Sequence, residues 1–236
     1  MAAVEIAPHV VLLEKLMGVL GLVDKAGHSV IPQHILYTWL IMLILIVLSW
    51  LGTRRLSVVP KGMQNFMEVL VSGMENFVVS SMGENGRRVF PFLLTLFLFI
   101  LFGNLIGLVP GCNAPTAVLN TNFALAICVF IYYNYLGLTL HGPKYIKHFT
   151  GPVWWMVPLM LPIELISHLV RPVSLSFRLF GNIFGEEMTL ILFFFLLPLV
   201  STLPIYFLYL LIKILQAFVF FMLSMIYLQQ SFEEAH

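Results

Sequence analysis

Charged residues are scarce in this sequence. They make up 10% of its 236 residues, whereas 60% of the residues are hydrophobic. A soluble domain carries about 25% charged residues, so this chain cannot cover a water-facing surface. The formal net charge of +1 gives no basic surface for a nucleic acid, and no nucleic-acid partner is expected. The composition therefore indicates an integral membrane protein.

Three further features are absent or rare. Apolar and polar residues do not alternate over strand-length segments, which argues against an outer-membrane β-barrel. No internal repeat is visible, and no metal site or cofactor is expected. The only two cysteines are Cys112, in an expected loop, and Cys128, in an expected helix. No disulfide is therefore expected between them.

Long apolar segments are present throughout the chain. They recur at roughly 20 residues, the length that an α-helix needs to cross the hydrocarbon core of a bilayer. The sequence predicts an all-α integral membrane protein with about five transmembrane helices. The expected crossings are residues 35–51, 90–108, 121–140, 153–196 and 204–228.

Two other segments have amphipathic character. Residues 61–82 carry apolar side chains at helical spacing, interrupted by polar positions, which predicts an interfacial helix. Residues 10–23 fit either a short amphipathic helix or a partly ordered tail. The whole chain is expected to be a single membrane domain. Its parts are an outer N-terminal segment (1–33), three spans with the interfacial helix (34–149) and a channel-forming helical hairpin (150–236).

Basic residues alternate with uncharged connections along the chain. Lysine and arginine in short loops stay on the cytoplasmic side of a membrane, so their positions predict the topology. Five crossings then place the N-terminus outside and the C-terminus in the cytoplasm. The residues that mark the inner side are Arg54, Arg55, Arg87, Arg88, Lys144 and Lys147.

The fourth expected crossing is too long for a helix perpendicular to the membrane. Residues 153–196 would extend for roughly 65 Å at about 1.5 Å per residue. Pro162 and Pro172 each remove a backbone donor within this segment. The helix is therefore expected to be strongly tilted, kinked or broken.

The same segment holds the most polar stretch of the chain, residues 164–187. Ionisable groups at membrane depth are energetically expensive, which makes them candidates for a functional site. On a helical wheel Glu187 falls opposite Arg178, and Glu186 falls between them. One polar stripe consists of Glu164, Ser167, Arg171, Ser174 and Arg178.

The last expected helix carries a matching polar stripe. Its members are Tyr206, Tyr209, Lys213 and Gln216. Two successive polar stripes predict an antiparallel hairpin that either lines a water-filled path or holds helices together through hydrogen bonds. Lys213 either lines that path or pairs with Glu186 or Glu187. Arg171 either lines it or extends to the membrane surface, and His168 is either part of it or an interhelical hydrogen-bonding residue.

Arg178 is the most difficult of these residues to explain structurally. A guanidinium group stays protonated in proteins, so it needs an anion nearby. Glu164 is about four helical turns away, and Glu187 points to the opposite side. The sequence therefore predicts that the partner carboxylate comes from another chain.

Four segments resemble one known family. RPVSLSFRLFGNIFGEE, LQAFVFFMLSMIYL, FGNLIGLVPG and PTAVLNTNFALA are similar to motifs of the a subunit of the F-type rotary ATP synthase membrane sector. The resemblance extends from about residue 30 onward. It implies a non-catalytic stator subunit in a bacterial inner membrane. The expected partners are a ring of c subunits, a b-subunit peripheral stalk, the soluble ATPase head and the lipid bilayer.

The resemblance also implies roles for individual residues. Arg178 matches the essential stator arginine, and Asn182 and Gln216 match polar positions near it. An outer proton half-channel would include Glu187, Glu186, Tyr209 and Lys213. An inner half-channel would include Glu164, Ser167, His168 and Arg171.

Two positions depart from the family pattern. Tyr209 stands where many relatives have a histidine or an acidic residue, and Lys213 is not part of the pattern. A secondary ion transporter or antiporter, and a structural anchor of a respiratory complex, are the alternative functions. The absence of a repeat disfavours the transporter.

Overall fold

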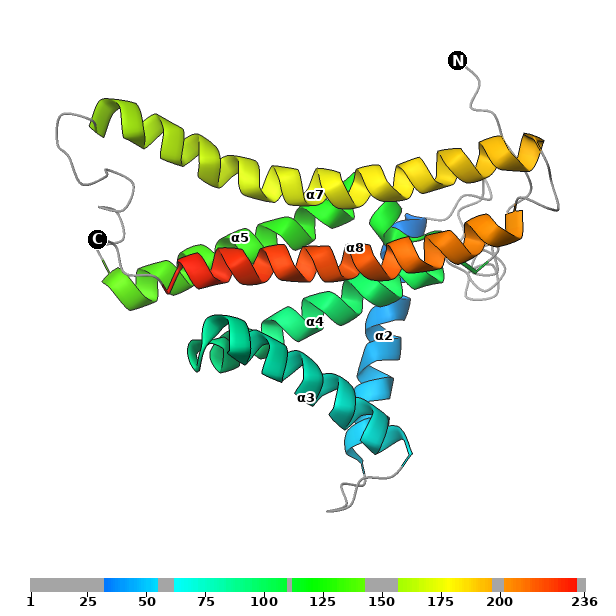
Figure 1. Ribbon diagram of the computed structural model, residues 1–236, viewed down its shortest axis with the longest axis horizontal. Helices are drawn as coiled ribbons and strands as arrows, with labels where there is room; N and C mark the ends of the chain where they lie inside the picture. Colours follow the sequence, from blue (N-terminus) through cyan, green and yellow to red (C-terminus); the bar gives the residue numbers. More distant parts are fainter. Residues whose placement is uncertain (1–31, 55–61, 110–111, 143–156, 197–201, 233–236) are drawn as a thin grey trace, which may run out of the picture.

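A computed structural model describes residues 32–54, 62–109, 112–142, 157–196 and 202–232 (Figure 1). Within these ranges the chain forms six α-helices, one short 3-10 helix and no strand. The predicted helix at 10–23, Arg55, Lys144 and Lys147 lie outside the described residues. The elements are α2 (Gln33–Thr53), α3 (Met63–Met82), α4 (Asn85–Ile106), η1 (Pro115–Ala117), α5 (Leu119–His141), α7 (Val157–Leu196) and α8 (Thr202–Gln230).

The all-α membrane fold predicted from the sequence is confirmed. Among the described residues, four helices are long and apolar enough to cross a membrane. They are α2, α4, α5 and the Pro204–Gln230 part of α8, which coincide with four of the five expected crossings. The remaining expected crossing is present as α7, but this more polar helix is not one of the four. Cys112 and Cys128 are both free thiols, as expected.

The amphipathic segment forms α3, which packs against α2 and α4. Its Val78 is fully buried, and the Phe77 ring centroid lies 5.8 Å from that of Phe218 in α8. The other end of the predicted apolar stripe does not join this core, because Phe66 and Val69 are exposed. Gly83, with φ of +68°, ends the helix and turns the chain into α4. Positive φ is accessible to glycine without steric cost.

The core lies where α4 and α8 pack side by side (Figure 1). The Phe97 ring of α4 meets the Phe221 ring of α8 edge-on at 5.7 Å. Asn104, which follows Phe97 in α4, contacts Lys213, which precedes Phe221 in α8, so the two helices are antiparallel. Apolar side chains that repeat at helical spacing pack across this pair.

The two longest helices, α7 and α8, form the predicted antiparallel hairpin. Helix α7 is a continuous, gently bowed helix that includes Pro162 and Pro172, so of the three expected distortions a break is wrong (Figure 1). Helix α7 also packs against α5. Helix α2 crosses the other long helices steeply (Figure 1). Helix α7 therefore lies at one edge of the bundle, and its outer face is uncovered by the described residues (Figure 1).

Candidate functional site

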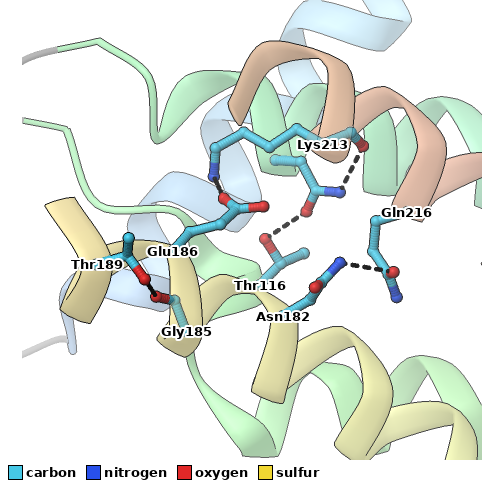
Figure 2. Close-up of polar contacts among 8 residues, drawn as sticks. Thr116, Asn182, Gly185, Glu186, Thr189, Lys213 and Gln216 are labelled. Atoms are coloured by element: carbon cyan, nitrogen blue, oxygen red, sulfur yellow. Dashed lines mark hydrogen bonds and ion pairs between the residues drawn. The ribbon is translucent and has the colours of Figure 1, made fainter. Parts of the chain in front are cut away.

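Polar side chains of α7 and α8 meet along the hairpin. Asn182 of α7 donates a hydrogen bond from Nδ2 to Oε1 of Gln216 in α8, at 2.9 Å (Figure 2). Gln216 is buried and Asn182 is half-buried. Because successive polar residues on each helix are three or four positions apart, they face the same neighbour. On α7 this contact comes from Asn182, one turn beyond Arg178, and not from the predicted stripe, whose members Ser167 and Arg178 are exposed.

One turn along the hairpin, Glu186 and Lys213 form an ion pair. The Lys213 Nζ lies 3.0 Å from a carboxylate oxygen of Glu186, and the two side chains are 6% and 7% exposed. Lys213 was predicted to pair with Glu186 or Glu187, and the residue that it contacts is Glu186 (Figure 2). Glu187 is exposed on α7. Removal of one partner of such a pair strongly destabilises a protein, because the other charge stays buried without compensation.

Three fully buried polar residues support this ion pair from the far side of α8. Asn104 Nδ2 donates to the Lys213 backbone carbonyl at 3.2 Å, and Asn104 Oδ1 accepts from the Thr116 hydroxyl at 2.8 Å (Figure 2). Asn122 Nδ2 donates to the Thr116 carbonyl at 2.7 Å. Sequence reasoning did not assign these residues to the site. The sequence feature that pointed to them was Asn104, a polar residue within the apolar segment of α4.

Tyr209 completes this group, which we call the lysine cluster: Glu186, Lys213, Tyr209, Asn104, Thr116 and Asn122. Its side chain is 6% exposed. The hydroxyl faces Thr189 of α7 but completes no hydrogen bond of normal geometry among the described residues. A buried hydroxyl usually has a hydrogen-bond partner. This one therefore keeps donor and acceptor capacity next to a charged pair.

A second polar group, the histidine cluster, lies nearer the start of α7. It consists of Glu164, His168 and Arg171 of α7, with Tyr133 of α5 and Tyr227 of α8. The Tyr133 hydroxyl is hydrogen-bonded to His168 Nδ1, and His168 Nε2 lies 3.2 Å from a Glu164 oxygen. The Arg171 guanidinium carbon lies 5.9 Å and 5.4 Å from the ring centroids of Tyr133 and Tyr227. These distances fit cation–π contacts.

Arg178 lies between the two clusters but belongs to neither. It comes 14 residues after Glu164 and eight before Glu186, roughly 21 Å and 12 Å along the helix. Its side chain is exposed and forms no hydrogen bond or ion pair with the described residues. The neighbouring Phe177 and Phe184 are exposed as well. An arginine on an uncovered apolar face has no counter-charge within the described part of its own chain.

The structure thus sorts the sequence-predicted residues into three groups. It brings Glu186, Tyr209, Lys213, Asn182 and Gln216 together between α7 and α8. It gathers Glu164, His168 and Arg171 around Tyr133. It leaves Ser167, Arg178 and Glu187 on the outside of the bundle.

Fold and site together define a multi-pass helical membrane protein with ionisable groups clustered along its longest helix. Comparison with known sequences is more specific. The family described as ATP synthase A chain matches residues 35–229, and the chain belongs to this family. It is therefore a multi-pass membrane subunit of an ATP synthase complex, with a part in ATP synthesis and proton transport.

Similarity to individual relatives extends over nearly the whole chain. It is 57% identical to the ATP synthase subunit a of Solidesulfovibrio magneticus over 233 residues, which cover 97% of this chain and 98% of that protein. The subunit of Oleidesulfovibrio alaskensis is 56% identical over 229 residues, with the same coverage. That of Geobacter sulfurreducens is 52% identical over 214 residues, or 91% and 92% of the two chains.

Proposed function

We propose that this chain is the stator subunit of a rotary ATP synthase and provides two proton half-channels to a ring of c subunits. Proton flow through these paths drives rotation of the ring and ATP synthesis in the soluble head. The chain itself neither makes nor cleaves ATP. The observation that carries the proposal is Arg178, an exposed cation on α7 that has no counter-charge among the described residues.

Arg178 meets the rotor in this mechanism. A carboxylate at membrane depth on each ring subunit supplies the anion that the guanidinium needs. Because arginine stays protonated, it attracts this carboxylate only in its ionised form. The same fixed positive charge opposes the direct passage of a proton from one path to the other. Asn182 and Gln216, which are hydrogen-bonded to each other, line the approach to this contact.

The outer path delivers protons to the ring. It is lined by Glu187 and Glu186 of α7 and by Tyr209, Lys213 and Gln216 of α8. Support comes from the position of the lysine cluster on one side of Arg178 and from the exposure of Glu187. A proton from this path neutralises a ring carboxylate. The neutral carboxyl group can then rotate into lipid, where an ionised group would be expensive.

The inner path receives protons from the ring on the cytoplasmic side. It includes Glu164, Ser167, His168 and Arg171, which lie on the other side of Arg178 along α7. Support comes from the half-exposed carboxylate of Glu164 beside a buried histidine. Each charge that crosses about 100 mV supplies roughly 2.3 kcal/mol, so several protons are needed for each ATP.

The remaining expectations belong to the same proposal. The chain functions as a single membrane domain in a bacterial inner membrane, with its N-terminus outside and its C-terminus in the cytoplasm. It contacts lipid, the c-ring and a b-subunit peripheral stalk, and through the complex it is joined to the soluble head. No cofactor takes part. Residues 150–236 form the channel hairpin.

Substitution of Arg178 tests the proposal. In inverted vesicles that contain the whole complex, we expect Arg178→Ala to abolish ATP-driven proton pumping, measured by fluorescence quenching of a pH-sensitive dye, while passive leakage persists. Arg178→Lys should also fail, because a lysine can lose its proton when desolvated. Arg88→Ala, at an exposed position in α4, is the matched control and should pump normally.

Normal pumping by the alanine variant would overturn the proposal. Purification distinguishes the proposed stator role from the two alternative functions. Co-isolation of the chain with a c-ring and a soluble ATPase head supports the stator, whereas isolation without them points to a secondary transporter or a structural anchor.

A further inference from the structure

Lys213 is the one charged residue in the sequence of α8, Thr202–Gln230. Its Nζ lies 3.0 Å from a carboxylate oxygen of Glu186, and both side chains are more than nine-tenths buried (Figure 2). A charged group at membrane depth is expensive. Stability does not account for the pair, because two well-packed hydrophobic residues in its place are often equally or more stabilising. The ion pair therefore calls for a functional explanation.

Oxygen atoms lie beside the ammonium group of Lys213. Glu186 brings its carboxylate, and Tyr209, four residues before Lys213, lies on the same face of α8. The Tyr209 side chain is 6% exposed, and its hydroxyl has no hydrogen-bond partner of normal geometry among the described residues. Glu186 is close enough to act electrostatically on this hydroxyl. Oxygen atoms are the ligands that hard metal cations prefer, so this group suits a cation.

Lys213 is held in place at both ends. Its backbone carbonyl accepts a hydrogen bond from Asn104 Nδ2 at 3.2 Å, and Asn104 Oδ1 accepts one from the Thr116 hydroxyl at 2.8 Å. Asn104 and Thr116 are fully buried. At the other end of the side chain, the ammonium group could move away only by leaving the Glu186 carboxylate buried without a counter-charge, which is costly. The ammonium group therefore stays where a metal cation would bind.

A fixed ammonium group affects protons and metal cations differently. A proton advances by exchange of hydrogen bonds between water and side chains, so it needs no empty coordination site. A sodium or potassium ion must travel as an ion and replace bound water with protein oxygens. Because Lys213 already neutralises Glu186, a metal ion gains no compensating attraction there for the water that it loses.

We propose that the Lys213 ammonium group occupies the cation position of an oxygen site formed by Glu186 and Tyr209, and that it thereby excludes sodium and potassium ions from the outer proton path. Lys213 is then a specificity-determining residue of this path. Protons pass the ion pair without being carried by it. The inference rests on the proposed function, because it assigns these residues to the outer path.

The test is Lys213→Gln in the whole complex. In inverted vesicles the outer path opens to the lumen, so the vesicles are loaded with sodium chloride or with choline chloride at equal ionic strength. ATP-driven pumping is then followed with the pH-sensitive dye. The luminal sodium concentration that halves pumping should be at least about fivefold lower in the variant than in the unaltered complex. One unit charge at about 4 Å changes the local concentration of a cation by this factor even in water.

Two control variants separate the charge from the packing. Lys213→Arg keeps the positive charge and should respond to sodium like the unaltered complex. Lys213→Gln/Glu186→Gln also lacks the anion that would bind sodium, so it should respond in the same way. Inhibition of Lys213→Gln should weaken at lower pH, because protons compete with sodium for the Glu186 carboxylate. The titratable groups that act on this carboxylate among the described residues are Lys213, Tyr209 and Glu187.

Equal sodium sensitivity of Lys213→Gln and the unaltered complex overturns the inference. If the variant does not assemble, chemical unfolding of the purified full chain in detergent decides instead, since a bound cation stabilises the folded state. Sodium chloride, compared with choline chloride, should raise the unfolding midpoint of Lys213→Gln but not that of the unaltered chain, and the absence of this rise contradicts the site. This measurement needs no ring, whereas normal pumping by Arg178→Ala refutes the proposed function, so the two failures are distinguishable.

Discussion

The lysine cluster and the histidine cluster lie on the same helix, yet the chain satisfies their charges differently. In the lysine cluster a carboxylate and an ammonium group meet directly at 3.0 Å, both almost completely buried. In the histidine cluster a ring stands between a buried hydroxyl and a half-exposed carboxylate. A direct buried pair resists any change of charge, because either partner alone is costly. A histidine can exchange protons with little rearrangement.

The difference follows from how the other helices cover α7. Asn104 of α4 and Thr116 of η1 extend the polar contacts of the lysine cluster behind α8. The histidine cluster is covered by Tyr133 of α5 and Tyr227 of α8 but leaves Glu164 half-exposed. One cluster of the hairpin thus holds a buried ion pair, and the other holds a half-exposed carboxylate.

The largest loss of stability is expected when the ion pair of Glu186 and Lys213 is broken. Lys213→Met leaves the Glu186 carboxylate buried without its cation, which should lower the free energy of unfolding by about 3–5 kcal/mol. Chemical unfolding of the purified subunit in detergent measures this. The double variant Lys213→Met/Glu186→Leu removes both charges and should recover most of the loss.

Glu187→Gln is the control for this pair, because Glu187 is exposed and its neutralisation should change stability little. Equal stability of Lys213→Met and the unaltered chain would show that the pair does not hold the hairpin together. The lysine cluster would then be no more important for stability than the histidine cluster.

A smaller loss of stability is expected when Asn104, which contacts the backbone of Lys213, is substituted. Asn104→Ala removes the acceptor of the Thr116 hydroxyl and the donor to the Lys213 carbonyl, which should cost about 1–3 kcal/mol. The midpoint of unfolding reports it. Asn113→Ala serves as control, since its hydrogen bond with Gln33 is exposed. If both variants lose the same stability, burial of the Asn104 contacts is not what matters.

Substitutions in the histidine cluster should lower stability less than substitutions in the lysine cluster. Arg171→Met removes two cation–π contacts, each worth about 0.5–1 kcal/mol at a partly exposed site. Arg54→Met, which removes one such contact with exposed Trp50, is the comparison and should change the unfolding midpoint less. A loss as large as that of Lys213→Met would mean that both clusters are rigid.

The smallest loss of stability is expected at Gly181, which lies between the two clusters along α7. A Cβ atom at Gly181 would meet no atom of the described chain within 4 Å, so Gly181→Ala should not lower the free energy of unfolding. The higher helix propensity of alanine should raise it by at most about 1 kcal/mol. Under the proposed function Gly181→Ala should still weaken co-purification with the c-ring, because α7 faces the rotor there. Gly107→Ala is the opposite control: its Cβ would lie 2.8 Å from Ala114, and it should destabilise the chain itself.

Most of the fold could be predicted from the sequence. Helix positions followed from apolar length, and α2, α4, α5 and α8 lie within a few residues of the expected crossings. The hairpin followed from matching polar stripes on α7 and α8. The apolar stripe of α3 was only partly informative, because Phe66 and Val69 have the same spacing as the buried residues but face outward. Periodicity identifies a face but not its neighbour.

Local features could thus be predicted from the residues alone: the membrane class, the helices and the ionisable residues of α7. Which of these residues meet depends on how the helices pack. Lys213 contacts Glu186, and its carbonyl is bonded to Asn104, 109 positions away. Tyr133 is bonded to His168, 35 positions away. Helical periodicity relates residues within a few turns, whereas these contacts depend on how separate helices pack.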